Sequence, residues 1–391
     1  MSRNLIWSSR EESVGDRKKL SPLLKWNWGK RWELEHVFSN LPQGFKSYFE
    51  PFVWWGSVYT SIEAENYYIN DKSHELIDLY RIITWENRWL FFSALETIND
   101  NWDTLWEIPE RNKDFFLNLY RNFYSESMSW ETLSKEIHGF IERNASDFYG
   151  LFWAPLNCKI AVFIKEVIKN LIRKISRMRD LEKEWGVFSE ADIINNIETA
   201  LRSAFYIYLR FLYNHHQKYW LDSALYTAIF LFMRNFAYGW MFRYNDKWDF
   251  NVPYGWVSYN KLRFRKRVEY LTSDALSALL QKTEISNDDF EPFFEKHPPT
   301  QDDFVFLDPP YDSEFNEYAG NTFWDTDQKR LARYLLEKCE ARWMMIIWKT
   351  ALISELYKGP KVNIRTYDKK YLTNMRNRNA QAVQHLLITN Y

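Results

Sequence analysis

The fold class is decided by the segment DDFVFLDPPY, residues 302–311. Its four consecutive apolar residues, 304–307, are typical of a strand that is buried on both faces of a parallel sheet. The prolines at 309 and 310 lack a backbone N–H, so the chain cannot continue a hydrogen-bonded ladder there. Ligands of open α/β sheets bind at the carboxyl ends of strands. The segment therefore predicts an α/β sheet with a binding loop at Asp308-Pro309-Pro310-Tyr311.

This loop combines a carboxylate, a fixed main-chain carbonyl and an aromatic ring. The amino group of a nucleobase is a poor nucleophile, because its lone pair is delocalised into the ring. Two acceptors on its N–H groups, the Asp308 carboxylate and the Pro309 carbonyl, draw it toward tetrahedral geometry. Tyr311 can stack on a base that has left the duplex. The plainer alternative is a proline-rich turn that follows a buried strand.

Strand and helix patterns alternate at both ends of the chain. Strand-like runs occur at 46–50 and 67–70 near the start, and at 343–348 and 385–391 near the end. Between them, residues 84–231 contain few turn signals and many apolar positions at helical spacing. The pattern predicts an α/β sheet that carries a large helical insertion.

The composition indicates a globular protein. The 391 residues are 46% hydrophobic and 26% charged, with a formal net charge of -1, and leave room for two domains or one enlarged by an insertion. Cys158 and Cys339 suit neither a disulfide framework nor a zinc site, and we expect no metal. The polar start lacks a signal-peptide core, and the apolar run 224–233 is about half a membrane span, so we expect a cytoplasmic protein without membrane contact.

Five segments in order resemble the motifs of the DNA adenine methylase family, which are adenine-N6-specific methyltransferases with the cofactor motif ahead of the DPPY motif. They are KWNWGK (25–30), EPFVWWGSVY (50–59), Asp71 after a strand, FRYN through DFNVPYG (242–255) and DPPY (308–311). The resemblance implies a Rossmann-like class I S-adenosylmethionine-dependent methyltransferase sheet with a β-hairpin for DNA recognition. Its catalytic domain would span 20–83 and 260–391, and 84–259 would form a mostly helical insertion and target-recognition region with the hairpin at 238–259.

The same resemblance assigns roles to single residues. Trp26 would stack on the cofactor's adenine, Lys30 would lie near the target base or the cofactor, and Asp71 would bind the ribose hydroxyls. The turn around the methionine moiety would involve Glu50, Pro51, Phe52 and Gly56, with Asp308 also near the cofactor. DNA would be contacted by Tyr238, Met241, Arg243, Asn245 and Pro253.

The resemblance also implies an activity and partners. The expected reaction is methyl transfer from S-adenosyl-L-methionine to a flipped adenine in double-stranded DNA, by a monomer in a restriction-modification system with a cognate endonuclease. One alternative is an inactive DNA-binding homologue that has lost its cofactor pocket. Another is methylation of an amino group in RNA or protein, where Asn often replaces the acid at 308.

Tryptophan stands at several positions where the family has glycine. The chain has 20 Trp and 11 Gly, whereas average usage predicts roughly 4 and about 27. The family pattern has Gly or a small residue at Trp28, Trp54, Trp55, Trp240, Trp248 and Trp256. One hypothesis is that these are UGA codons, which some bacterial lineages translate as glycine. The alternatives are a degenerate homologue and a genuinely Trp-rich protein. We expect the tryptophan-bearing chain to bind the cofactor weakly, because indoles would fill the cofactor turn.

Overall fold

The computed structural model describes residues 20–24, 30–310, 323–369 and 383–391. In this part of the chain, seven strands form one sheet in the order β3-β2-β1-β4-β5-β7-β6. Neighbouring strands are parallel except that β7 runs antiparallel to both β5 and β6. The strands are β1 (Ser47–Glu50), β2 (Asn66–Asn70), β3 (Thr283–Ser286), β4 (Phe304–Leu307), β5 (Arg342–Trp348), β6 (Asn363–Lys369) and β7 (Val383–Thr389). The predicted α/β class is confirmed.

The central strands are short and apolar because helices cover both faces of the sheet. All four residues of β4 are buried, and Leu307 lies opposite Met345 of β5. One face packs against α1 (Lys30–Ser39), α2 (His74–Thr84) and α11 (Asp274–Gln281). The other packs against α12 (Phe290–Lys296), α13 (Asp325–Glu337) and α14 (Ala351–Leu356). Because β3, β2, β1, β4 and β5 run parallel, their carboxyl ends lie along one edge of the sheet.

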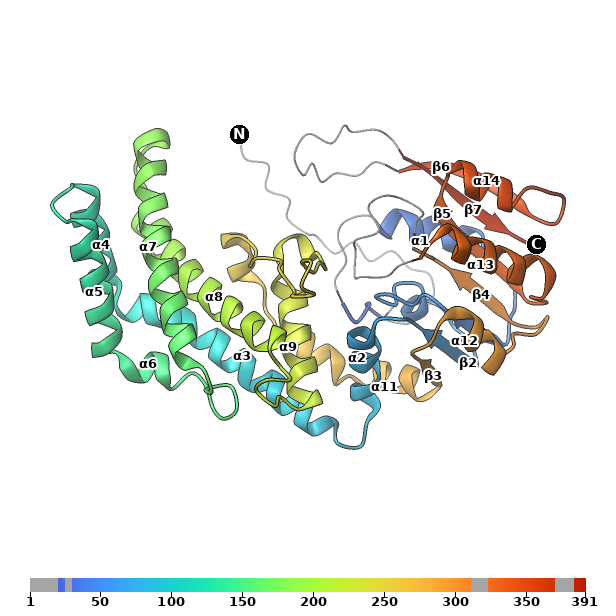
Figure 1. The fold of residues 1–391 in the computed structure, drawn as a ribbon, viewed down its shortest axis with the longest axis horizontal. Helices are drawn as coiled ribbons and strands as arrows, with labels where there is room; N and C mark the ends of the chain where they lie inside the picture. Colours follow the sequence, from blue (N-terminus) through green and yellow to red (C-terminus); the bar gives the residue numbers. More distant parts are fainter. Residues whose placement is uncertain (1–19, 25–29, 311–322, 370–382) are drawn as a thin grey trace.

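The middle of the chain is helical, as the spacing of its apolar residues predicts. It extends away from the sheet as a separate group of helices (Figure 1). They are α3 (Arg88–Arg111), α4 (Lys113–Tyr124), α5 (Trp130–Arg143), α6 (Ala145–Tyr149), α7 (Ile160–Trp185), α8 (Glu190–Asn214) and α9 (Ser223–Phe236), and α10 (Arg265–Leu271) follows later in the chain. Ser189 begins α8 with a capping box to Asp192. In the described part of the chain, no helix combines the length and apolarity needed to cross a bilayer.

Three features are not anticipated by the sequence patterns. Strands β3 and β6 were not predicted, because TEIS is short and mostly polar and NIRTYDK is mostly exposed. The predicted hairpin after α9 is held by two isolated antiparallel bridges, Ala237 with Tyr254 and Tyr244 with Phe250, instead of a continuous ladder. Short 3-10 turns occur at η1 (Tyr59–Ser61), η2 (Tyr238–Trp240) and η3 (Val257–Lys261).

Candidate functional site

Four adjacent parallel strands, β3, β2, β1 and β4, deliver the residues of the candidate site. A recess lies where these strands end. Its walls are formed by Pro51, Phe52, Trp54, Asn70, Asp71, Lys72, Asp288, Asp289, Phe290, Pro310 and Phe323. Residues from four separate chain segments therefore share one cavity at the edge where α/β sheets bind ligands.

Asp71 is the buried acid of this recess. Its side chain follows β2 directly and is 4% exposed. One carboxylate oxygen accepts from the backbone N–H of Trp54 at 3.1 Å, and the other accepts from that of Ser73 at 2.9 Å. Burial raises the pKa of Asp71 to about 6, although these backbone donors act in the opposite direction. A carboxylate held this way at the recess wall suits a ligand that donates hydroxyl hydrogens to it.

Asp71→Asn should make the stability of the ligand-free chain less dependent on pH. Because the folded pKa lies above the ordinary value of 3.8, ionised Asp71 destabilises the fold. This loss of unfolding free energy is present above pH 6 and disappears as the pH falls from about 6 toward 3.8. Relative to the parent, we expect the free energy of unfolding of the variant to be higher by up to about 3 kcal/mol at pH 8 than near pH 4. A pH-independent loss accompanies this difference, because the amide can accept from only one of the two backbone N–H groups. Urea titration at both pH values measures the difference, with the exposed Asp302→Asn as the matched control. A change that is equal at both pH values would contradict the assignment.

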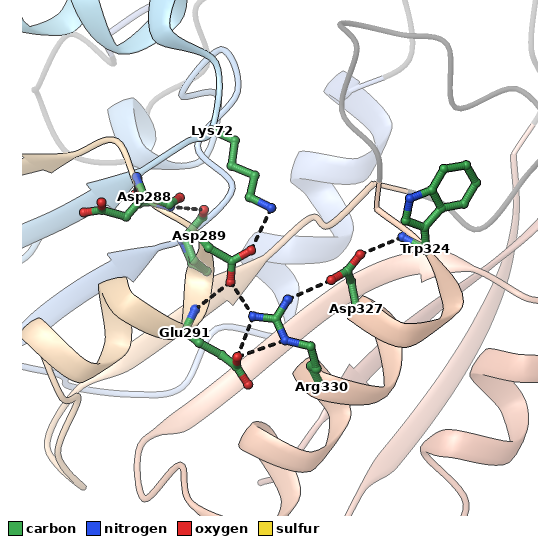
Figure 2. Close-up of polar contacts among 9 residues, drawn as sticks. Lys72, Asp288, Asp289, Glu291, Trp324, Asp327 and Arg330 are labelled. Atoms are coloured by element: carbon green, nitrogen blue, oxygen red, sulfur yellow. Dashed lines mark hydrogen bonds and ion pairs between the residues drawn. The ribbon is translucent and has the colours of Figure 1, made fainter.

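The residues after β3 form the second polar wall (Figure 2). Asp289 binds Lys72 at 2.7 Å and Arg330 of α13 at 2.8 Å. Arg330 also pairs with Glu291 and Asp327, so one guanidinium joins α12 to α13. Burial alone would raise the pKa of Asp289, but hydrogen bonds from Lys72 and Arg330 keep it below the ordinary value.

Asp288 differs from its neighbour Asp289. Its backbone N–H donates to the Asn70 side chain at 2.9 Å, which fixes this loop against the end of β2. Its carboxylate is exposed, lines the recess and forms no hydrogen bond or ion pair within the described residues. The sequence patterns missed this acid because β3 was not predicted. The signal was present in TEISNDDF, a short strand followed by two acids.

Three phenylalanines form the apolar wall. The ring centroid of Phe52 lies 6.0 Å from that of Phe290 and 5.5 Å from that of Phe323, in tilted and edge-on contacts. The guanidinium of Arg330 lies over the Phe290 ring at 4.9 Å and supports it from behind. Acids beside an aromatic wall suit a ligand with a flat ring on a polyhydroxylated sugar.

The DPPY loop begins at the same edge. Asp308 is 6% exposed, and its carbonyl accepts a hydrogen bond from the indole Nε1 of Trp54 at 2.7 Å. The buried side-chain amide of Gln328 donates to the Pro310 carbonyl at 2.8 Å. These two contacts fix the backbone of residues 308–310. Pro309 is part of this loop, and Tyr311 lies outside the described residues.

The remaining predicted cofactor residues fall in different places. Glu50 is buried and accepts from the Tyr48 hydroxyl at 2.7 Å, and it does not line the recess. Pro51 and Phe52 do line it, whereas Gly56 closes the turn by donating to the Val53 carbonyl at 2.7 Å. Trp26 and the side chain of Lys30 lie outside the described residues.

The predicted DNA-contacting residues follow α9. Arg243 and Pro253 are exposed, whereas Tyr238 and Met241 are half-buried. Arg243 donates from Nε to the side-chain oxygen of Asn251 at 2.9 Å. Asn245 has a structural task, because its side-chain oxygen accepts from the backbone N–H groups of Lys247 and Asp249, each at 2.9 Å.

Glu75 joins this segment to the sheet. It lies in the first turn of α2, four residues after Asp71, and accepts from the Tyr244 hydroxyl at 3.0 Å. Tyr213 of α8 shares the cluster, with its hydroxyl 3.1 Å from that of Tyr244. The residue that follows Arg243 is therefore anchored to the helix that begins beside the recess.

A double-mutant cycle should detect this anchor. Glu75→Ala and Tyr244→Phe each remove one partner of a charge-assisted hydrogen bond that is partly buried. We expect a coupling of about 1–2 kcal/mol in the free energy of unfolding, measured by chemical denaturation of the four proteins of the cycle. Asn251→Ala combined with Glu75→Ala is the control, because Asn251 binds Arg243 instead. Equal coupling in both cycles would refute the anchor.

The comparisons with known proteins identify the family of the chain. Residues 156–375 match the family model described as D12 class N6 adenine-specific DNA methyltransferase, which is more than half of the chain. The chain belongs to this family, and the sheet and helices described above fit the class I methyltransferase fold.

Three relatives of this chain are named as type II methyltransferases. The chain is 34% identical over 167 residues to the type II methyltransferase M.CviBI of Paramecium bursaria Chlorella virus NC1A, a match that covers 41% of this chain and 60% of the relative. It is 28% identical to M.MjaIII of Methanocaldococcus jannaschii, covering 58% and 74% of the two chains. It is 22% identical to M1.LlaDCHI of Lactococcus lactis, covering 95% and 96%.

Proposed function

We propose that this chain methylates the N6 amino group of adenine at a specific sequence in double-stranded DNA, with S-adenosylmethionine as the donor. One observation carries the proposal. Asp71 after β2 and Pro310 of the DPPY loop after β4 line the same recess, and the backbone N–H of the residue at position 54 binds the Asp71 carboxylate. The turn after β1 and the DPPY loop therefore border the same recess, where a donor and an acceptor must meet.

The polar and aromatic walls of the recess suit the nucleoside part of the donor. Asp71 would accept from the ribose hydroxyls, and Asp288 would accept from the adenine amino group beside the wall formed by Phe52, Phe290 and Phe323. The donor supplies a methyl group on a positively charged sulfur. At the end of the recess nearest Asp308, however, the indole of Trp54 occupies the space, and this end does not fit the donor.

The DPPY loop would hold the target base. The Asp308 carboxylate and the Pro309 carbonyl would accept from its amino group and direct the nitrogen lone pair out of the ring plane. Gln328 supports this loop from behind through the Pro310 carbonyl. Tyr311 would stack on the extruded base. Rate enhancement would come from alignment of the reacting atoms and from a polar environment that favours the transition state.

The segment 238–254 would read the duplex. Arg243 offers its terminal nitrogens to the edge of a guanine, a contact worth about 1–3 kcal/mol of discrimination. The hydrogen bond between Tyr244 and Glu75 would hold Arg243 at a fixed position relative to the recess. We further propose a cytoplasmic, monomeric enzyme that protects DNA against a cognate restriction endonuclease.

Expression in a host without adenine-N6 methylation tests the proposal. The gene is expressed with tryptophan and with glycine at position 54, and chromosomal DNA is sequenced by a method that detects N6-methyladenine. We expect methylation at one sequence motif in the glycine version and none after Asp308→Ala. Absence of methylation from both versions, with retained DNA binding, would favour the inactive homologue. Modified RNA or protein with unmodified DNA would favour the other alternative.

A further inference from the structure

Tryptophan occupies backbone conformations that L-residues avoid. In the described part of the chain, five non-glycine residues have positive φ, and four of them are Trp54, Trp220, Trp240 and Trp248, with φ of 47°, 53°, 51° and 63°. The fifth is Glu126. Tryptophan makes up 20 of the 391 residues, so chance does not explain four out of five. Glycine is the residue that adopts this region without steric conflict between its side chain and the backbone.

Two of these tryptophans lie in turns that require glycine by their type. Gly239 and Trp240 both have positive φ, and the N–H of Met241 donates to the Tyr238 carbonyl at 3.2 Å. Such a turn has the type I′ form, which favours Asn-Gly or Gly-Gly.

The turn at Trp248 belongs to a different type. Its N–H donates to the Asn245 carbonyl at 2.9 Å, and Asn245 pairs with Asp249 across a three-residue loop. This is a type I turn completed by a bulge, and the bulge position is one that glycine normally fills. Both turns hold the segment that would read DNA.

Trp220 ends a helical stretch. The N–H of Leu221 donates to the His216 carbonyl at 3.1 Å, and the N–H of Trp220 donates to that of Gln217 at 3.4 Å. These are the two hydrogen bonds of a Schellman motif, with Trp220 at the left-handed position that glycine most often occupies. Its side chain is 89% exposed, so no packing accounts for an indole there. Family motifs do not cover this position, and it is independent of the resemblance.

Trp54 combines the same conformation with the site. It follows Val53 in the turn that Gly56 closes, and its indole projects into the recess beside Asp308. Trp54, whose indole occupies the space that the donor would need, therefore also has a backbone conformation that suits glycine.

Two other tryptophans, Trp102 and Trp343, lie in regular elements and are packed in the core. Trp102 is fully buried in α3, with its ring against Phe232 and Phe236 and beneath the guanidinium of Arg202 at 4.4 Å. Trp343 is fully buried within β5. Both have the regular backbone of their element and a packed environment. Some tryptophans are therefore built into the core, whereas the four at 54, 220, 240 and 248 stand in glycine conformations.

We infer that the native protein carries glycine at positions 54, 220, 240 and 248, because its cell reads UGA as glycine. The consequence at position 54 rests on the proposed function, since it opens the end of the recess where the methyl group would lie. The consequence at positions 220, 240 and 248 concerns the fold alone. The chain with glycine at all four positions is called the four-glycine chain below.

The test uses peptides of the protein isolated from its own cells, together with the codons of the gene. We expect UGA and a glycine residue at all four positions, and UGG and tryptophan at Trp102. Tryptophan in the native peptides at these positions would overturn the inference. This result does not depend on any activity, so it is distinct from failure of the proposed function.

Recombinant variants test the conformational argument separately. Trp220→Gly and Trp248→Gly should each raise the melting temperature, because they relieve a left-handed tryptophan whose side chain is largely exposed. Trp106→Gly is the control, since Trp106 is also exposed but lies in the interior of α3, where glycine weakens the helix and should lower the melting temperature. A lower melting temperature in the first two variants would contradict the inference.

Discussion

Replacing Asp308 with alanine in the four-glycine chain is expected to lower kcat for DNA methylation by about 10²–10⁴-fold. The carboxylate would be one of two acceptors that make the target nitrogen nucleophilic, and its effect would be largest in the transition state. The KM for DNA should change far less, because the contacts that read the duplex lie on another segment. Single-turnover methylation of a duplex with one target adenine measures the rate.

Calorimetry with S-adenosylmethionine is the control for this variant. Asp308 is buried beside the residue at position 54, so a collapsed site would also lose donor affinity. Asp308→Asn keeps one acceptor and the shape of the side chain, and it should retain more of the rate than alanine. If both variants kept kcat within threefold of the parent, the DPPY loop could not have the role assigned to it.

The site was predictable wherever a strand pattern was intact. The run FVFL located β4 and the loop after it, and YYIN located β2 and therefore Asp71. The second acidic wall was not predicted. Strand β3 is only Thr283–Ser286, and its residues alternate too weakly to distinguish a strand from a loop. β3 is extended because it pairs with β2, which lies more than two hundred residues earlier in the chain. Such long-range pairing is a tertiary effect that local sequence patterns do not reveal.

Composition supplied one prediction that periodicity could not. The excess of tryptophan and the deficit of glycine indicated that some indoles stand in place of glycine, and family motifs and backbone angles each identify candidates. Family positions gave Trp54, Trp240 and Trp248, and the conformation added Trp220. For Trp256, φ is -93° in the described structure, so that position receives no support from its backbone. Trp28 lies outside the described residues.

Trp54→Gly is expected to raise the affinity for S-adenosylmethionine at least tenfold, which corresponds to about 1.4 kcal/mol. The substitution removes an indole that lines the recess and binds the Asp308 carbonyl, and it leaves the backbone N–H that binds Asp71. Glycine also adopts φ of 47° without strain, so the turn is preserved. Isothermal calorimetry on the tryptophan-bearing chain and the variant gives the difference.

Trp220→Gly separates this effect from a general gain in stability. It relieves the same left-handed conformation, but position 220 lies beyond α8 and does not line the recess. We therefore expect its donor affinity to equal that of the parent. A similar gain in both variants would mean that the fold, not the occupied recess, limits binding. Tight binding by the tryptophan-bearing chain itself would show that the indole is no obstacle, and the donor would then have to lie along the wall of Asp71 and Phe290 without entering the space beside Asp308.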